Sequence, residues 1–234
     1  MINLVAASIF FLGIHLLIAG TSLRTRVVSV TGEGAYLGLF SLISLGGIAW
    51  LSMAYDAAQL SANPVYWVAP AGLMHAAPLV MLLAFVLMIV GLTTPNPTAV
   101  KAEGLLDKPD TIKGILRITR HPFLWSAILW AALHLAMNGD LASILFFGTF
   151  LVLAAMGTGS IDAKKRRALG EKWADFAKQT SNIPFAAIIT GRNHLALGEI
   201  GLWRILLGVV VFGGAFYGHL WLFGVAPVPG WAPY

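Results

Sequence analysis

Residues 70–92 read PAGLMHAAPLVMLLAFVLMIVGL and contain no Asp, Glu, Lys or Arg. A helix that spans a bilayer needs about 20 consecutive, predominantly apolar residues, and this run supplies them. Further uncharged windows recur along the chain. The sequence therefore predicts an all-α, polytopic membrane helical bundle with about six transmembrane helices, near Leu4–Gly20, Tyr36–Ala54, Pro70–Leu92, Pro122–Met137, Leu141–Gly159 and Ile205–Phe223.

The composition of the whole chain agrees with this prediction. Of 234 residues, 58% are hydrophobic and only 11% charged, with a mean hydropathy of +0.81. Soluble domains carry about a quarter charged residues, which cover their core with a polar surface. The chain has no cysteine, and this excludes disulfides, thiolate-ligated haem, iron–sulfur clusters and Cys-based zinc sites.

The positive charge is confined to alternate loops. All fifteen Lys and Arg residues lie in segments 21–33, 93–120 and 160–199 or at Arg204. The positive-inside rule places these segments in the cytoplasm and both termini on the extracytoplasmic side. The net charge of +5 therefore reflects membrane topology, and we expect a lipid bilayer rather than a nucleic acid as the partner.

The segment from about 162 to 182 has the pattern of an amphipathic helix. Leu169, Trp173, Phe176 and Ala177 fall on one helical face, and most of the basic residues lie elsewhere. This pattern predicts a cytoplasmic helix that lies in the membrane interface and anchors the loop to anionic lipid. We expect residues 1–234 to form a single integral-membrane domain that includes this segment.

Histidines are the main candidates for chemistry, because ionisable side chains inside a span default to a functional hypothesis. His194 lies in a polar loop, and His219 lies near the end of the last span. With no cysteine and no carboxylate inside the spans, the available ligands are imidazole and, beside it, methionine, and this set suits haem iron better than zinc or di-iron. The remaining candidates are His15, His75, His121 and His134.

The predicted depth of these histidines leaves their pairing open. His75 and His134 fall in the outer half of the membrane, whereas His15 lies nearer the inner face. Depth alone therefore pairs His75 with His134. For each histidine, the alternative is a hydrogen bond between helices without any metal.

The start of the fourth predicted span has the features of an anion site. His121 precedes Pro122, which suits a first helical position, and Arg117 and Arg120 lie just before it. A helix N-terminus with two guanidinium groups can hold a lipid phosphate, a haem propionate or a cofactor carboxylate. The alternative is a helix cap with arginines that reach the aqueous surface.

Two motifs carry a resemblance to a known family. They are GILRITRHP at 114–122, followed by Trp130 and Leu133-His134, and PFAAIITGR at 184–192. In combination they resemble the NnrU family of bacterial membrane proteins, which is similar to plant and cyanobacterial 15-cis-zeta-carotene isomerase. The resemblance implies a multi-pass protein of the bacterial cytoplasmic (inner) membrane that binds haem b.

The resemblance also implies which residues bind the cofactor. The two axial histidines of the isomerase match His15 and His134, which we expect to ligate the iron despite the depth argument, because helix tilt absorbs several ångströms. His75 and His121 are expected beside the haem or as alternative ligands. Arg117 and Arg120 are expected to bind the cofactor through a haem propionate.

The family resemblance implies a role in denitrification, particularly nitric oxide metabolism. Nitric oxide and redox or denitrification proteins are then the expected partners. An alternative is haem-dependent cis–trans isomerisation of a carotenoid-like polyene, although the cysteine that the isomerase is thought to use as an alternative ligand has no counterpart here.

A further alternative comes from a second resemblance. The R-H-P run and the segment LGEKWADF at 169–176 resemble isoprenylcysteine and phospholipid methyltransferases, which use S-adenosylmethionine. Those enzymes usually carry a Glu pair before the amphipathic helix, and here only Asp162 stands in that stretch. A lipid-binding scaffold for another membrane enzyme is the remaining alternative.

Overall fold

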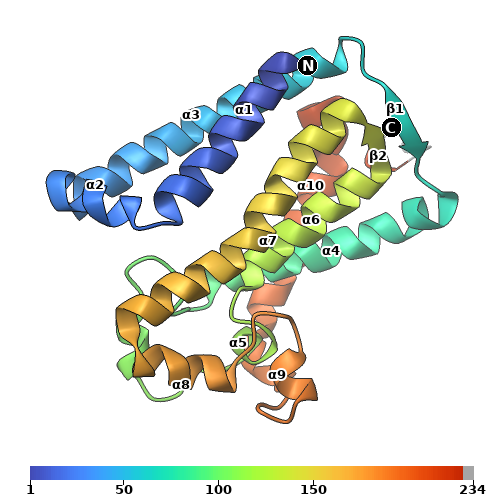
Figure 1. The fold of residues 1–234 in the computed structure, drawn as a ribbon. Coiled ribbons are helices and arrows are strands. Elements are labelled where there is room, and N and C mark those ends of the chain that lie inside the picture. The colour runs from blue at the N-terminus through green and yellow to red at the C-terminus, as the bar shows by residue number, and fades with distance from the viewer. Residues whose placement is uncertain (229–234) are drawn as a thin grey trace. The chain divides into compact units, whose positions relative to one another are not determined.

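The computed structural model describes residues 1–228, and almost all of its regular structure is helical (Figure 1). Uncharged, helix-favouring runs form the long helices, and Gly, Pro and polar residues separate them. The elements are α1 (Ile2–Gly13), the π-helical η1 (Ile14–Ala19), α2 (Leu23–Thr31), α3 (Glu33–Gln59), β1 (Val65–Val68), α4 (Ala71–Thr93), the 3₁₀ turn η2 (Glu103–Asp107), α5 (Ile115–Ile118), α6 (Pro122–Met137), β2 (Asn138–Asp140), α7 (Leu141–Leu169), α8 (Glu171–Gln179), α9 (Ala186–Ile189), the 3₁₀ turn η3 (Leu197–Ile200) and α10 (Leu202–Phe223).

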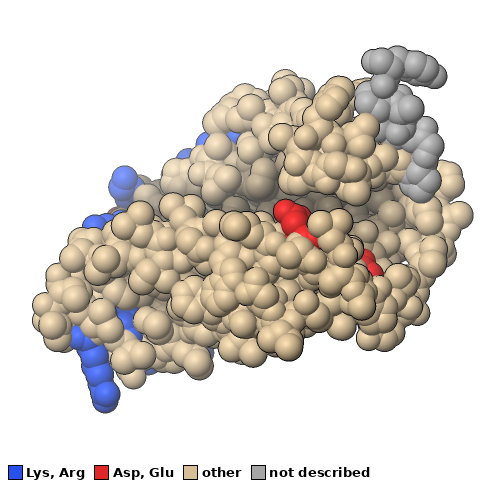
Figure 2. All heavy atoms as spheres, turned by 90° about the horizontal axis from the view of Figure 1, so that it is seen from above, with Lys and Arg blue, Asp and Glu red and all other residues tan. Residues whose placement is uncertain are grey.

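Helices long and apolar enough to cross a membrane confirm the predicted fold class. Their windows are only 6–33% buried within the protein, as expected where lipid covers the remaining surface. The face drawn in Figure 2 accordingly consists almost entirely of uncharged residues. The five helices of this kind among the described residues are Ile2–Ala19, Glu33–Gln59, Ala71–Thr93, Leu141–Leu169 and Leu202–Phe223.

The fourth predicted span is shorter than the others. Helix α6 is apolar but has only 16 residues. At 1.5 Å per residue it is about 24 Å long, whereas the hydrocarbon core of a bilayer is about 30 Å thick. The chain is a multi-pass membrane protein, and a full crossing by α6 stays a prediction.

The chain divides into two compact units. Unit 1 comprises Met1–Ala69 and Ala131–Ser160, and unit 2 comprises Pro70–Trp130 and the chain from Ile161 onward. The divisions fall within α6 and α7, so each of these helices contributes residues to both units. The organisation as a single domain stays a prediction.

Unit 1 is built on the contact of α1 with α3, with the first part of α7 added to the same core. Several of its buried positions are alanines, which let membrane helices approach closely. The buried core residues are Leu4, Ala7, Phe11, Ile14, Leu51, Ala54, Ala58 and Ala142.

A short antiparallel ladder in unit 1 was not anticipated from the sequence. Strand β1 pairs with β2, with Trp67 opposite Gly139 and Val68 opposite Asn138. A Cβ atom on Gly139 would lie 2.0 Å from the carbonyl oxygen of Trp67, so only glycine fits there. Asp140 Oδ1 then accepts the backbone N–H of Ser143 at 2.9 Å and caps the start of α7.

Unit 2 is built on the contact of α4 with α10. Gly208 of α10 lies against Val86 of α4, where a Cβ atom would come within 2.8 Å of the Val86 Cα. A second buried cluster joins the end of α4 to α5 and η3 through Val90, Leu116 and Ile200. This cluster holds the loop that precedes α6.

The structure corrects the predicted interfacial helix in its bounds and in what covers its apolar face. Helix α7 continues to Leu169, so the basic residues at 164–167 form its last turns, and α8 begins only after Gly170. Trp173 is 0% and Phe176 3% exposed, which means that the apolar face of α8 packs inside the protein. It is therefore not open to lipid. On its polar side, Lys172 pairs with Asp107 of η2 at 2.6 Å.

Candidate functional site

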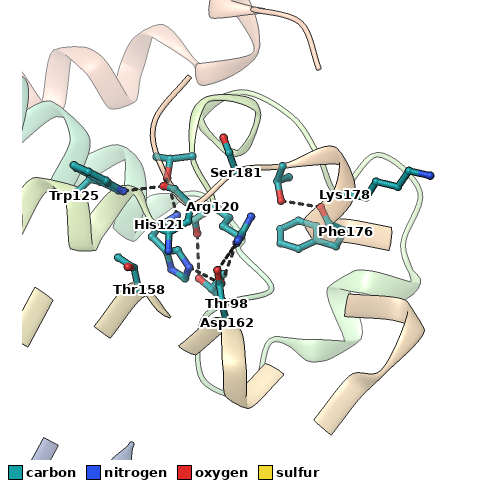
Figure 3. A network of polar contacts seen from close by, with 12 residues as sticks. Thr98, Arg120, His121, Trp125, Thr158, Asp162, Phe176, Lys178 and Ser181 are labelled. Carbon is teal, nitrogen blue, oxygen red and sulfur yellow. Dashed lines mark hydrogen bonds and ion pairs between the residues drawn. The ribbon is translucent and has the colours of Figure 1, made fainter. Parts of the chain in front are cut away.

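A buried ionic network lies where the R-H-P motif meets α7 (Figure 3). The Nε of Arg120 donates to both carboxylate oxygens of Asp162, at 2.9 and 3.0 Å, and its Nη2 donates to Oδ2 as well. His121 Nε2 lies 2.7 Å from Oδ1 of the same carboxylate. The three side chains are 10%, 11% and 1% exposed for Arg120, Asp162 and His121. Each charge therefore depends on its partners, because an unpaired buried charge is costly.

The backbone around Arg120 is fixed by the segment that follows α8. The Arg120 N–H donates to the carbonyl of Ser181 at 2.9 Å. The Arg120 carbonyl accepts the side-chain amide of Asn96 at 2.9 Å and the hydroxyl of Thr98 at 3.3 Å. These bonds hold the start of α6 on both sides.

The same segment brings the two family motifs together. The carbonyl of Asn182 accepts the Thr119 hydroxyl at 2.7 Å and the Trp125 indole N–H at 2.8 Å. The Phe185 N–H donates to the carbonyl of Ile118 at 2.8 Å. Residues around 114–122 and 181–185 thus form one structural site in unit 2, although about 60 residues separate them in the sequence.

Arg117 has a carboxylate partner of its own. Its Nε and Nη2 donate to the two oxygens of Glu199 at 2.7 and 3.0 Å, and the Gly114 N–H donates to Oε2 at 2.7 Å. The hydrogen bond from Arg117 is the main cause that lowers the pKa of Glu199 to about 2. Arg117 and Arg120 at the start of α6 are thus already paired with Glu199 and Asp162.

The Arg117–Glu199 pair predicts a pH dependence of stability. Because the folded-state pKa of Glu199 lies below its ordinary value of 4.5, the pair stabilises the fold above about pH 4.5 and ceases to do so as the pH falls through about 2. We expect Glu199→Gln to lower the thermal unfolding midpoint in detergent at about pH 6, and the difference from wild type to shrink on acidification. The same change at exposed Glu171 is the control. A difference that grows with acid would contradict the assignment.

His15 has one ring nitrogen fixed and the other turned to a neighbouring helix. Its Nδ1 lies 2.8 Å from the Phe11 carbonyl and must donate to it, so the lone pair is on Nε2, which lies 3.5 Å from the Ser44 hydroxyl. The ring packs 4.5 Å from that of Phe11 and 5.2 Å from that of Phe40. It belongs to η1, a π-helical turn of the kind often found at functional sites.

His134 lies in unit 1 as well and borders the same group of aromatic rings. Its imidazole stacks on Phe147 with centroids 4.8 Å apart and planes 30° apart. Phe147 contacts Phe146 at 5.1 Å, and Phe146 contacts Phe150 at 5.2 Å. Phe150 in turn lies 5.7 Å from Phe11, which packs on His15. We call Phe11, Phe146, Phe147 and Phe150 the aromatic cluster.

The other histidines have separate surroundings. His75 is exposed near the start of α4 in unit 2, with Nδ1 2.7 Å from the Ala71 carbonyl. His121 belongs to the Asp162 network, and His194 is exposed in a loop. His219 Nδ1 lies 2.8 Å from the carbonyl of Val225 near the end of α10. The structure therefore groups His15 with His134, and His75 with His121, by unit.

The sequence did not predict that two carboxylates, those of Asp162 and Glu199, pair with the basic residues of these sites. Asp162 is the first charged residue after the uncharged window 141–161, which was the available signal for its burial. Its oxygens are already bonded to Arg120 and His121, so little of its charge is left for the ammonium of S-adenosylmethionine. Glu199 gave no comparable signal, because it lies in a loop distant in sequence from Arg117.

Comparison with known proteins identifies the family. The family model described as NnrU protein matches residues 3–227. The 15-cis-zeta-carotene isomerase, chloroplastic, of Zea mays is 28% identical over 182 residues, which cover 74% of this chain and 47% of that protein. Its namesake from Arabidopsis thaliana is 34% identical over 82 residues, or 35% of this chain and 22% of the relative. The chain thus matches less than half the length of either relative, and no solved structure matches it. This protein belongs to the NnrU family.

Proposed function

We propose that this protein binds haem b through His15 and His134 in the bacterial cytoplasmic membrane, with both termini on the extracytoplasmic side. The observation that carries the proposal is that both imidazoles lie in unit 1 and border one aromatic cluster. Bound haem would supply a redox-active iron. A role in nitric oxide metabolism, together with a redox or denitrification partner, belongs to the same proposal.

The donor chemistry of the residues fits this group. Imidazole nitrogens are common axial ligands of haem iron. The hydrogen bond from His15 Nδ1 to the Phe11 carbonyl orients the ring and raises the basicity of Nε2, as is usual for metal-ligating histidines. Among residues 1–228 no group of three or more His, Asp or Glu could hold a metal ion.

The surroundings of His15 fit as well. Phe11 and Phe40 pack on the His15 ring, so its immediate surroundings are apolar and aromatic, as a porphyrin requires. The rings of the aromatic cluster contact one another, and they would have to move apart to admit a porphyrin. The Tyr36 hydroxyl is buried and makes no hydrogen bond within the described part of the chain, and its ring stacks on Phe40, next to His15. A buried hydroxyl without a partner is unusual, and here it is a donor available to a bound polar group.

Absorption spectra test the haem proposal. The protein purified in detergent is expected to show the sharp reduced bands of bis-imidazole haem after addition of dithionite, with iron and haem in equal amounts. His15→Ala or His134→Ala should weaken haem binding by more than about tenfold, because even outer partners of a metal ligand cost 10- to 100-fold.

Two further variants serve as controls. His194→Ala removes an exposed imidazole and should leave the spectrum unchanged. His75→Ala tests the pairing that depth favoured. Full haem content in His15→Ala, or loss of haem in His75→Ala alone, would reject the proposed ligand pair.

A second candidate function is cis–trans isomerisation of a carotenoid-like polyene. The similarity to the maize isomerase over 74% of this chain favours it. Incubation of the reduced protein with a cis-polyene, followed by chromatography of the isomers, tests this candidate. Unchanged isomer composition with intact haem would reject it for that substrate.

A further inference from the structure

We propose that a pocket lined in part by Arg120 of the R-H-P motif binds a phosphate group, and that this group belongs to an anionic phospholipid. The pocket has a volume of about 250 Å³ and lies within unit 2. Its polar lining consists of Arg120, Thr180, Ser181, Asn182 and Arg192. The proposal does not depend on the proposed haem site, because His15 and His134 belong to unit 1 and do not line this pocket.

Arg192 is held in place by the end of α8. Its Nη1 donates to the carbonyls of Lys178 at 2.8 Å and Thr180 at 3.1 Å, and its Nε donates to the Thr190 hydroxyl at 2.9 Å. Its Nη2 has no partner in the part of the chain that the structure describes. The guanidinium is therefore fixed in position with one amino group left for a ligand.

Arg120 is the second arginine of the pocket. Its Nε and Nη2 are bonded to Asp162, whereas its Nη1 has no hydrogen-bond partner within residues 1–228. Its side chain is nine-tenths buried. Two guanidinium groups in one pocket are a common arrangement for phosphate, because each presents paired N–H donors to its oxygens.

The hydroxyl groups of the pocket are already used within the protein. The Thr180 hydroxyl donates to the Phe176 carbonyl at 2.7 Å. The Ser181 hydroxyl accepts the Ala187 N–H at 3.0 Å and donates to the Ile118 carbonyl at 3.4 Å. The donors that remain are therefore mainly N–H groups, and these require a ligand that accepts hydrogen bonds.

The charge and size of the pocket favour a small anion. Asp162 offsets the charge of Arg120, but among the described residues no carboxylate pairs with Arg192, and no Asp or Glu lines the pocket. A cationic group would find no carboxylate in the lining and would face two guanidinium groups. The pocket has room for a phosphate group and is open to the surface, so the rest of a phosphate-bearing ligand could extend outward.

Apolar side chains at the edge of the pocket favour a lipid as the source of the phosphate. Ile183 and Ala186 line the pocket, and Ile183 is 64% exposed. Phe185 and Ile189 do not line it, but they are close to Ala186 in the sequence and are 46% and 81% exposed. In a multi-pass membrane protein, such side chains next to a basic pocket suit acyl chains beside a headgroup. Free phosphate is the other source of the same chemistry.

Thermal unfolding of the full-length protein in detergent can test the proposal. Dioleoyl phosphatidylglycerol should stabilise the protein more than dioleoyl phosphatidylcholine, and native mass spectrometry should show the anionic lipid retained. Arg192→Gln should weaken this binding about tenfold, the usual effect of losing a charge-assisted hydrogen bond. Arg167→Gln, the same charge change at an exposed position of α7, should leave it unchanged.

Further arms separate the remaining outcomes. Ala186→Leu fills the pocket without changing any charge and should weaken lipid binding as Arg192→Gln does, which guards against a folding defect in either variant. Stabilisation by inorganic phosphate that depends on Arg192, without any effect of the lipid, would keep the phosphate site and assign it to the free anion. Equal effects of Arg167→Gln and Arg192→Gln, or no effect of either ligand, would overturn the proposal.

Discussion

Asp162→Ala is expected to lower the free energy of unfolding by about 3–5 kcal/mol, the usual effect of removing one partner from a buried ion pair. The substitution leaves the guanidinium of Arg120 and the imidazole of His121 without their shared acceptor in the protein interior. The start of α6 should loosen with them. Reversible unfolding in mixed detergent, followed by tryptophan fluorescence, measures the change.

Matched variants show whether the loss comes from this network. Asp175→Ala removes an exposed carboxylate from α8 and should stay within about 0.5 kcal/mol of wild type. In a double-mutant cycle, Asp162→Ala combined with Arg120→Ala should cost much less than the sum of the single changes. Additive effects, or a neutral Asp162→Ala, would show that the pair is not formed.

Gly139→Val is expected to destabilise unit 1 by about 3 kcal/mol or more, the upper range for overpacked positions. A Cβ atom there would lie 2.0 Å from the carbonyl oxygen and 2.7 Å from Cγ of Trp67, so β1 and β2 could not stay paired. The indole N–H of Trp67, which donates to the Ala136 carbonyl at 3.1 Å, should lose its partner. The same unfolding assay applies, with tryptophan emission as a local probe.

Gly148→Ala provides a control of opposite sign. Nothing lies within 4 Å of a Cβ atom at Gly148, which is in the interior of α7. Alanine should therefore stabilise the helix by up to about 1 kcal/mol. A destabilised Gly148→Ala together with a tolerated Gly139→Val would contradict the packing described for unit 1.

The membrane fold could be predicted because its signal is local. An uncharged window of sufficient length is recognisable without knowledge of any neighbour, since the bilayer is the partner of the helix. The same reliance on uncharged windows explains why the predicted span ends at Gly159, whereas α7 continues to Leu169. Residues 162–167 interrupt the uncharged window, but Lys, Arg and Ala are good helix formers and let the helix continue to Leu169.

The apolar face of α8 shows where the local signal stops. The spacing of Trp173 and Phe176 predicts an amphipathic helix, and α8 is one. The same pattern serves equally well for a face against lipid and a face against protein. Only the tertiary structure decided between them, by burying both side chains in unit 2.

The sequence alone determined that this protein is a multi-pass helical membrane protein with candidate histidines in its spans. Hydropathy and titratable residues can be assigned position by position, without knowledge of tertiary contacts. Only the tertiary structure decided which residues pair with one another at its sites. Arg120 meets Asp162, Arg117 meets Glu199 and Trp67 meets Gly139 across long stretches of chain. Such contacts produce no periodic pattern in the sequence, because they join residues that only the packing of distant segments brings together.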